Sequence, residues 1–121
     1  MTVVIFFSDR SGYFYYKLNI TGMTISIQFV KMPTSEALAS YTEKRVQKLA
    51  TKYSWLINAD VSFKMGPDAI KDKVCEIELS LPGPKIFASS KEENFETAVN
   101  NTISDLNRQL RKRKETTFNN Y

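Results

Sequence analysis

The stretch that decides the fold is VCEIELSLPGPKIFASS, residues 74–90. Apolar residues occupy the odd positions from Cys75 to Leu81, and polar residues occupy the positions between them. This period of two is typical of a strand with one buried face. Pro82-Gly83 fits the central positions of a type II turn, after which Lys85–Ser89 would return as an antiparallel strand. The stretch therefore predicts a hairpin in a sheet that has one buried and one solvated face.

The residues before this hairpin predict two more strands with a helix between them. MTISIQFV, residues 23–30, and residues 57–65 both alternate apolar and polar positions. Between them, residues suited to burial recur at steps of three and four from an N-cap at Thr34 to about Tyr53, which is the pattern of an amphipathic helix. Its buried stripe would be Leu38, Thr42, Val46, Leu49 and Tyr53.

A second helix should follow the hairpin. Ser90-Lys91-Glu92-Glu93 matches the capping box, in which serine and glutamate satisfy each other's backbone N–H groups. The order β-α-β-β-β-α predicts the α/β (α+β) class, a two-layer sandwich with a four-stranded sheet and both helices on one face. The buried stripe of this last helix would be Phe95, Val99, Thr102, Leu106 and Leu110.

Residues 1–22, MTVVIFFSDRSGYFYYKLNITG, fit this pattern less simply. A charged pair interrupts the apolar start, and no basic region precedes it, which argues against a secretory signal. The interpretation we favour is that Met23 is the biological start and that the preceding residues are upstream sequence. The alternative is an extra strand at the sheet edge, at Val3–Phe7 or at Tyr13–Ile20.

The composition restricts the chemistry open to this chain. A chain of 121 residues is ordinarily one domain, which we place at residues 23–114, with a frayed tail over 115–121. There is no histidine and Cys75 is the only cysteine, so a histidine-based triad is excluded and no zinc site is expected. The lack of any intramolecular disulfide fits a reducing, cytoplasmic location. We expect no enzyme, cofactor, metal, membrane contact or small-molecule substrate.

The charge pattern is the most informative functional feature. The net charge is only +4, but NRQLRKRK, residues 107–114, holds five cations and no acid. Cations near a helix C-terminus gain about 0.3–1 kcal/mol each from the helix dipole, but four in succession also repel one another. Two helices on one face would set such charges side by side, as a phosphate backbone requires. The candidate RNA-binding residues are Lys44, Arg45, Lys48, Lys52, Arg108, Arg111, Lys112, Arg113 and Lys114.

Other interpretations of these and neighbouring residues stay open at this stage. The basic residues could form a merely solvated face, or could meet an acidic protein or a membrane surface. The acids Glu92, Glu93 and Glu96 are explained by capping and dipole compensation rather than by catalysis. Trp55 could stack on a base, although packing under a helix end is favoured, and Cys75 is expected to be an inert core residue.

Four segments also carry a family likeness in their order and spacing. They are TSEALASYTEKRVQKL, INADVSFK, VCEIELSLPGPKIFASS and NFETAVNNTISDLNRQLRKRK, and the likeness as a whole runs from about Thr24 to Lys114. These segments resemble the ribosome hibernation promoting factor and ribosome-associated inhibitor family, also labelled sigma-54 modulation protein. The most specific part is the block from Ala98 to Leu110 with its basic continuation.

The resemblance implies a non-catalytic domain that binds the small ribosomal subunit and its ribosomal RNA. It would block the channel for messenger and transfer RNA, and so inhibit translation in stationary phase or stress. The family's RNA-facing positions carry over to Arg45, Lys48, Lys52, Arg108, Arg111, Lys112 and Arg113. The alternative is a generic double-stranded-RNA-binding-domain-like module, but such domains usually present cations at the start of the last helix, which is acidic here.

The chain also departs from the family pattern. Glu93-Asn94-Phe95 stands where the family commonly has an Asp-Met/Leu-Tyr triplet, so Phe95 lacks a hydroxyl group there. The sequence stops soon after the basic run, whereas long members add a C-terminal dimerisation domain. We therefore expect a short form of the family.

Overall fold

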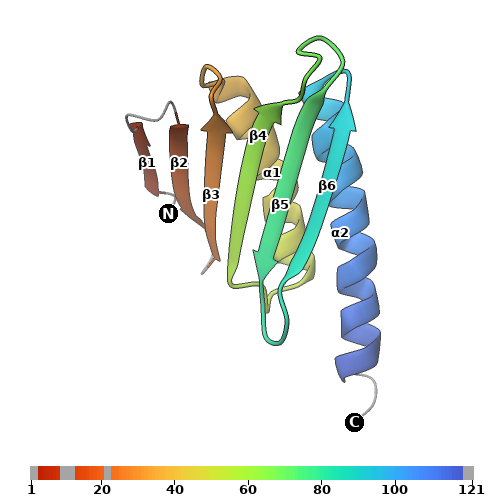
Figure 1. The fold of residues 1–121 in the computed structure, drawn as a ribbon. Coiled ribbons are helices and arrows are strands. Elements are labelled where there is room, and N and C mark those ends of the chain that lie inside the picture. Colours follow the sequence, from red (N-terminus) through yellow and green to blue (C-terminus); the bar gives the residue numbers. More distant parts are fainter. Residues whose placement is uncertain (1–2, 9–12, 21–22, 119–121) are drawn as a thin grey trace.

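The computed structural model describes residues 3–8, 13–20 and 23–118, with side chains from residue 23 to residue 116 (Figure 1). From residue 23 onward the element order is β-α-β-β-β-α, as the sequence predicts. Two strands precede this unit. The elements are β1 (Val3–Ser8), β2 (Tyr13–Ile20), β3 (Met23–Val30), α1 (Glu36–Lys52), β4 (Asn58–Met65), β5 (Lys73–Ser80), β6 (Ile86–Glu92) and α2 (Phe95–Phe118).

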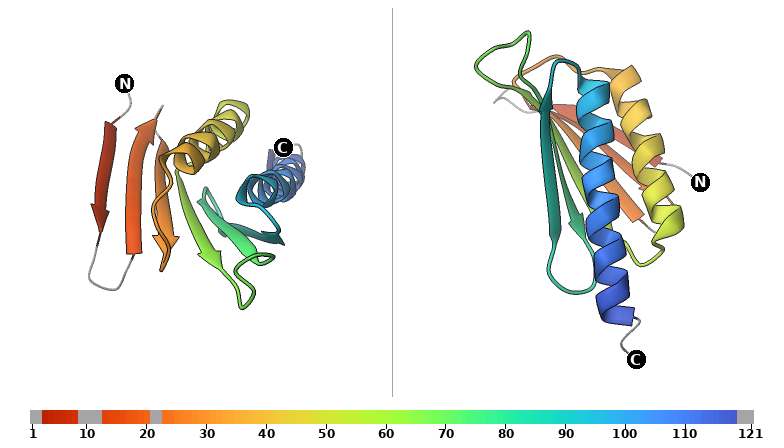
Figure 2. Two further views of the ribbon diagram at one scale, coloured as in Figure 1. Left: turned by 90° about the horizontal axis from the view of Figure 1, so that it is seen from above. Right: turned by 90° about the vertical axis from the view of Figure 1, so that its right-hand side faces the viewer.

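The strands form one sheet in the order β1-β2-β3-β4-β5-β6. The β3–β4 pair, which α1 connects, is parallel, and every other neighbouring pair is antiparallel. Both helices lie on the same face of this sheet (Figure 2). The predicted two-layer α+β arrangement is therefore confirmed.

The sheet is wider than the predicted four strands, which correspond to β3–β6. β2 pairs with β3 along its whole length, from Tyr13 opposite Val30 to Ile20 opposite Met23. The aromatic and β-branched residues of this segment favour strands, and an unpaired β3 edge offers them backbone partners. The edge-strand alternative for residues 1–22 thus describes the backbone at both Val3–Ser8 and Tyr13–Ile20. Met23 as the biological start stays a prediction.

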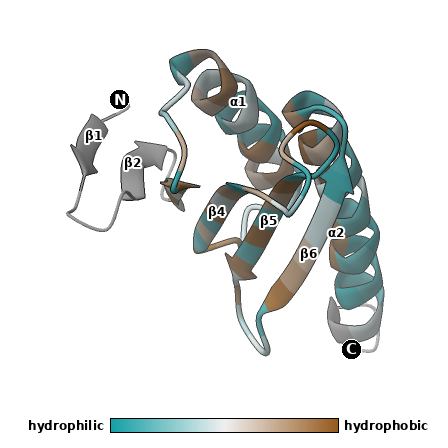
Figure 3. Ribbon diagram, turned by 45° about the horizontal axis from the view of Figure 1, so that its top comes forward, coloured by the Kyte–Doolittle hydropathy of each residue, from teal (hydrophilic) through white to brown (hydrophobic). Residues whose placement is uncertain are grey.

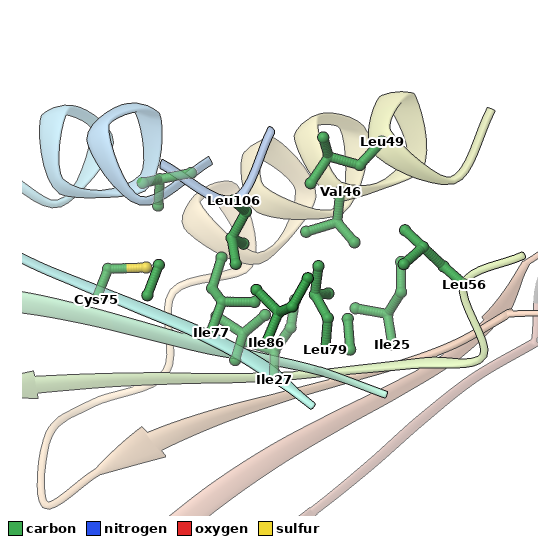
Figure 4. Close-up of a cluster of buried hydrophobic side chains, with 14 of the residues drawn as sticks. Ile25, Ile27, Val46, Leu49, Leu56, Cys75, Ile77, Leu79, Ile86 and Leu106 are labelled. Atoms are coloured by element: carbon green, nitrogen blue, oxygen red, sulfur yellow. The ribbon is translucent and has the colours of Figure 1, made fainter. Parts of the chain in front are cut away.

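Directly opposed residues of neighbouring strands point to the same face of a sheet. The buried residues therefore form rows on one face, and the core lies between this face and the helices. One buried row crosses the sheet through Ile27, Val61, Ile77 and Ala88, and parallel rows lie on either side of it. Figure 4 shows Ile27 and Ile77 of this row below Val46 and Leu106 of the helices. Hydrophobic and hydrophilic residues accordingly alternate along β4 and β5 (Figure 3). The helices cover these rows with Leu38, Val46, Leu49, Ala98, Val99, Leu106 and Leu110.

Two threonines belong to the buried helix stripes, as predicted. The hydroxyl group of Thr42 donates to the Leu38 carbonyl at 2.8 Å, and that of Thr102 donates to the Ala98 carbonyl at 2.8 Å. Each buried hydroxyl is thus satisfied within its own helix, so burial leaves no unpaired donor.

Both predicted helix caps are wrong in position. Ser35, not Thr34, caps α1, and its Oγ accepts from the backbone N–H of Leu38 at 3.2 Å. The capping box at residues 90–93 does not form, because β6 continues through Glu92 and pairs Ser90 with Cys75. Asn94 takes that role for α2, where its Oδ1 accepts from the backbone N–H of Thr97 at 2.7 Å. α2 then runs to Phe118, four residues into the segment that was expected to fray.

We expect Leu106→Ala to lower the free energy of unfolding by about 2–5 kcal/mol, because Leu106 is fully buried where α2 meets the sheet. Urea unfolding followed by circular dichroism measures the change. Thr97→Ala, at an exposed position of the same helix, is the control and should stay within about 0.5 kcal/mol. Equal effects of the two substitutions would contradict the assigned core.

Candidate nucleic-acid interface

The two helices lie side by side and run in the same direction, so that the C-terminal half of α1 lies beside the middle of the longer α2 (Figures 1 and 2). This arrangement follows from the two buried stripes, which place both helices on the same sheet face. Residues on the solvent-facing sides of the two helices therefore lie next to one another on the surface.

A groove of about 400 Å³ separates the helices, and we call it the interhelix groove. The cations on its α1 side are three of the predicted RNA-binding residues. The α2 side supplies amides and a hydroxyl group. The lining residues are Arg45, Lys48, Leu49 and Lys52 from α1, and Asn100, Ile103, Ser104 and Asn107 from α2.

One end of the groove is ordered by a relay from α1 to α2. Arg45 donates to the Tyr41 hydroxyl oxygen at 3.1 Å, and Tyr41 donates in turn to Asn100 Oδ1 at 2.9 Å. The Arg45 guanidinium also lies 5.2 Å from the centre of the Tyr41 ring, within cation–π range. Arg45 is thus held in place while keeping its charge and further N–H donors.

Asn107 orders the other end of the groove. Its Oδ1 accepts from Lys52 Nζ at 3.3 Å and from the Tyr53 hydroxyl at 3.1 Å. Because Asn107 lines the groove and its amide oxygen accepts both bonds, its amide nitrogen can act there only as a donor. The sequence-based prediction missed Tyr41, Asn100, Ser104 and Asn107. Asn100 and Asn107 are seven residues apart, which places them on one helix face, and this spacing was the available signal.

The basic surface continues beyond the groove toward the end of α2. A second hollow, of about 290 Å³, is lined by Lys52, Tyr53, Arg111, Lys114 and Glu115. Because Lys52 lines both hollows, they join into one surface. Among residues 23–116, none of the five cations on this surface forms an ion pair with a carboxylate. We call these five the groove strip: Arg45, Lys48, Lys52, Arg111 and Lys114.

The other four candidates lie elsewhere. Arg108 is 70% exposed and pairs with Asp105 on its own helix. Arg113 donates to the carbonyl oxygens of Pro82 at 3.2 Å and Pro84 at 2.9 Å, and Lys112 lies beside it against the same hairpin. Lys44 is exposed on α1 and lines neither hollow.

The geometry of an α-helix explains this split. Successive helical residues point about 100° apart, so four cations in succession surround the helix instead of sharing one face. Arg111 and Lys114 consequently face α1, whereas Lys112 and Arg113 face the β5–β6 hairpin. The structure unites five of the nine predicted residues and places four outside that surface.

Comparison with known proteins agrees with this fold. Residues 25–117 match the model of the family described as Sigma 54 modulation protein / S30EA ribosomal protein. The chain belongs to this family. The resemblance found in the sequence is therefore confirmed.

One relative found by sequence and two solved structures are similar to this chain. A protein of Pseudomonas putida named ribosome hibernation promoting factor is 25% identical over 93 residues, which cover 77% of this chain and 88% of the relative. A ribosomal subunit interface protein from Coxiella burnetii has a similar structure, with a TM-score of 0.65, 23% identity, and coverage of 76% of this chain and 96% of that one. The N-terminal domain of Thermus thermophilus Protein Y has a TM-score of 0.61 at 18% identity and covers 73% and 92% of the two chains. These structures share the fold of the family.

The remaining candidate residues take structural positions in this family member. Trp55 is half-buried and packs edge-to-face on Tyr53 with ring centres 5.7 Å apart, which supports its packing interpretation. Glu92 accepts from the side-chain amide of Asn101 at 2.7 Å. Within the described residues, no group of three metal-ligating side chains occurs, and no helix is long and apolar enough to cross a membrane.

Cys75 is completely buried on β5, as the alternation predicts. Burial raises the pKa of its thiol from the ordinary 9.0 to about 12, the Thr102 hydrogen bond opposes this shift, and the charge of Glu76 adds to it. The folded protein therefore keeps the thiol neutral and poorly nucleophilic at neutral pH.

We expect this proton to make stability depend on pH above 9.0. The unfolded chain releases the Cys75 proton there while the folded chain retains it, so the free energy of unfolding should fall by about 1.4 kcal/mol per pH unit from this group. Cys75→Ala lacks the group and serves as the reference in urea unfolding between about pH 8 and about pH 10.5. Identical pH slopes for the two proteins would show that the thiol is not buried.

Proposed function

We propose that this protein binds the small ribosomal subunit through its ribosomal RNA and inhibits translation in stationary phase or stress by occupying the channel for messenger and transfer RNA. The observation that carries the proposal is the groove strip, where five cations from two helices converge without carboxylate partners among residues 23–116. The names of the relatives, a ribosome hibernation promoting factor and a ribosomal subunit interface protein, support a ribosomal partner.

The chemistry of the groove lining favours an RNA backbone as the ligand. Arginine and lysine are donors only, and the amide nitrogens of Asn100 and Asn107 add neutral donors beside them. Phosphate oxygens and 2′-hydroxyl groups accept such hydrogen bonds, and every nucleotide of an RNA carries them whatever its base. Binding should therefore be insensitive to sequence and should release condensed counterions, which makes it weaken steeply with salt.

Inhibition through this surface requires no chemical step. A protein that occupies the channel excludes other RNA simply by volume and charge. The nine basic residues predicted from the sequence remain the proposed contacts, with the groove strip at the centre and Lys44, Arg108, Lys112 and Arg113 flanking it.

A generic duplex-RNA module is the second candidate function, because two helices on one sheet face also suit an RNA duplex. The start of α2 is acidic, with Glu93 and Glu96 both exposed, and this disfavours phosphate contact at that end. Competition between isolated small subunits and a duplex RNA of matched phosphate content separates the two functions. Preference for the free duplex would replace the ribosomal proposal with this one.

Charge reversal in the groove tests the proposal directly. We expect Lys48→Glu combined with Lys52→Glu to weaken co-sedimentation with small subunits by about tenfold or more at moderate salt. The slope of log affinity against log salt should also fall by roughly 1.5, because each phosphate that the protein no longer neutralises reduces that slope by about 0.7–0.9.

The matched control is Lys31→Glu combined with Lys71→Glu. It changes the net charge by the same amount at exposed positions outside the groove, in the β3–α1 loop and in the β4–β5 loop. Affinity and salt slope should stay close to those of the unaltered protein. Equal reductions in both double variants would mean that only net charge matters, and the groove would then not be the RNA site.

A further inference from the structure

A third hollow lies on the side of α2 that faces away from the groove, and we call it the outer hollow. It measures about 630 Å³, which falls within the range of about 300–1,000 Å³ typical of small-molecule sites. Residues of the β5–β6 hairpin line one side of it and residues near the end of α2 line the other. The lining residues are Pro82, Gly83, Pro84, Ile86, Gln109, Lys112, Arg113 and Thr116.

The walls of the outer hollow are held in place by α2. Arg113 donates to the carbonyl oxygens of both prolines, and it does so across Gly83, whose φ of +92° is the value that the turn requires. Gln109 Nε2 donates to the Phe87 carbonyl at 3.1 Å and to Asp105 Oδ2 at 3.0 Å. The hollow is thus preformed, so a ligand need not order it on binding.

The lining combines an apolar surface with positive charge. Ile86 is buried beneath the hollow and the exposed rings of Pro82 and Pro84 line it. Lys112 is exposed beside them and has no ion-pair partner in the part of the chain with described side chains. A ligand that matches these features has a flat apolar face linked to an anionic group.

We propose that the outer hollow binds one unpaired nucleotide, with its base against Pro82 and Pro84 and its phosphate at Lys112. The inference rests on the proposed function, because the nucleotide would belong to the same RNA whose backbone lies along the groove strip. A duplex hides the faces of its bases, so only an unpaired nucleotide can fill the hollow. The end of α2 is then contacted by RNA on two sides, through Arg111 and Lys114 at the groove and through Lys112 at the hollow, while Arg113 holds the hairpin.

The test is a nuclear magnetic resonance titration of the full chain with two probes. One is a single-stranded hexauridylate, and the other is an abasic hexamer with the same phosphates. The backbone amide of Gly83 and the side-chain amide of Gln109 report on the outer hollow, and the side-chain amides of Asn100 and Asn107 report on the groove. We expect both probes to shift the groove signals and only the hexauridylate to shift the hollow signals.

Two charge reversals separate the sites. Lys112→Glu should weaken the binding measured at the hollow signals by about fivefold or more and leave groove signals responsive, since stacking and phosphate contact there act together. Lys71→Glu is the control, because Lys71 is exposed in the β4–β5 loop and does not line the outer hollow. It should leave the hollow signals unchanged.

Each remaining outcome decides against one specific claim. Shifts at the groove without shifts at the hollow would overturn this inference and leave the proposed function intact. Shifts at the hollow that are equal for both probes would show phosphate binding without base recognition, and would also overturn it. Stronger shifts with a tryptophan-containing oligoglutamate peptide than with hexauridylate would assign the hollow to an acidic protein segment. If neither the hexamers nor whole small subunits shifted or broadened the signals of either site, the proposed function itself would be rejected.

Discussion

One-sided burial of the β3–β6 sheet is the constraint on which the rest of this structure depends. Apolar side chains of four strands point to one face, and the area is too wide for a single helix to cover. Both helices must therefore pack there, side by side, with their buried stripes toward the sheet. Their remaining faces are forced outward together, and the interhelix groove is the consequence of that packing.

The packing also fixes where positive charge accumulates. Lys52 ends α1, close to Arg111 and Lys114 of α2, so three cations converge without a carboxylate ion pair among residues 23–116. Such proximity costs stability through repulsion, which the helix dipole offsets only partly. Burial of the stripes stabilises the arrangement despite this cost. An RNA backbone, the ligand proposed above, would relieve the repulsion.

Hydrogen bonds between the helices give the groove a defined shape. Tyr41 and Tyr53 each donate to an asparagine of α2, and each also lies under a cation of α1. These contacts restrict long side chains that would otherwise lose more conformational entropy on binding. Arg113 serves a different purpose, because its hydrogen bonds join α2 to the hairpin and thereby shape the outer hollow.

The sequence by itself determined the order of the helices and strands from residue 23 onward and which face of each is buried, because periods of two and of three to four are local properties of the chain. It also determined which residues carry charge. The tertiary structure alone decided that Ser90 stays in a strand, since the ladder with Cys75 outweighs a local capping pattern. It alone decided which cations share a surface and which asparagines order it. Those properties depend on the distance and rotation between two helices, and packing sets both for residues that lie 54 to 59 positions apart in the sequence.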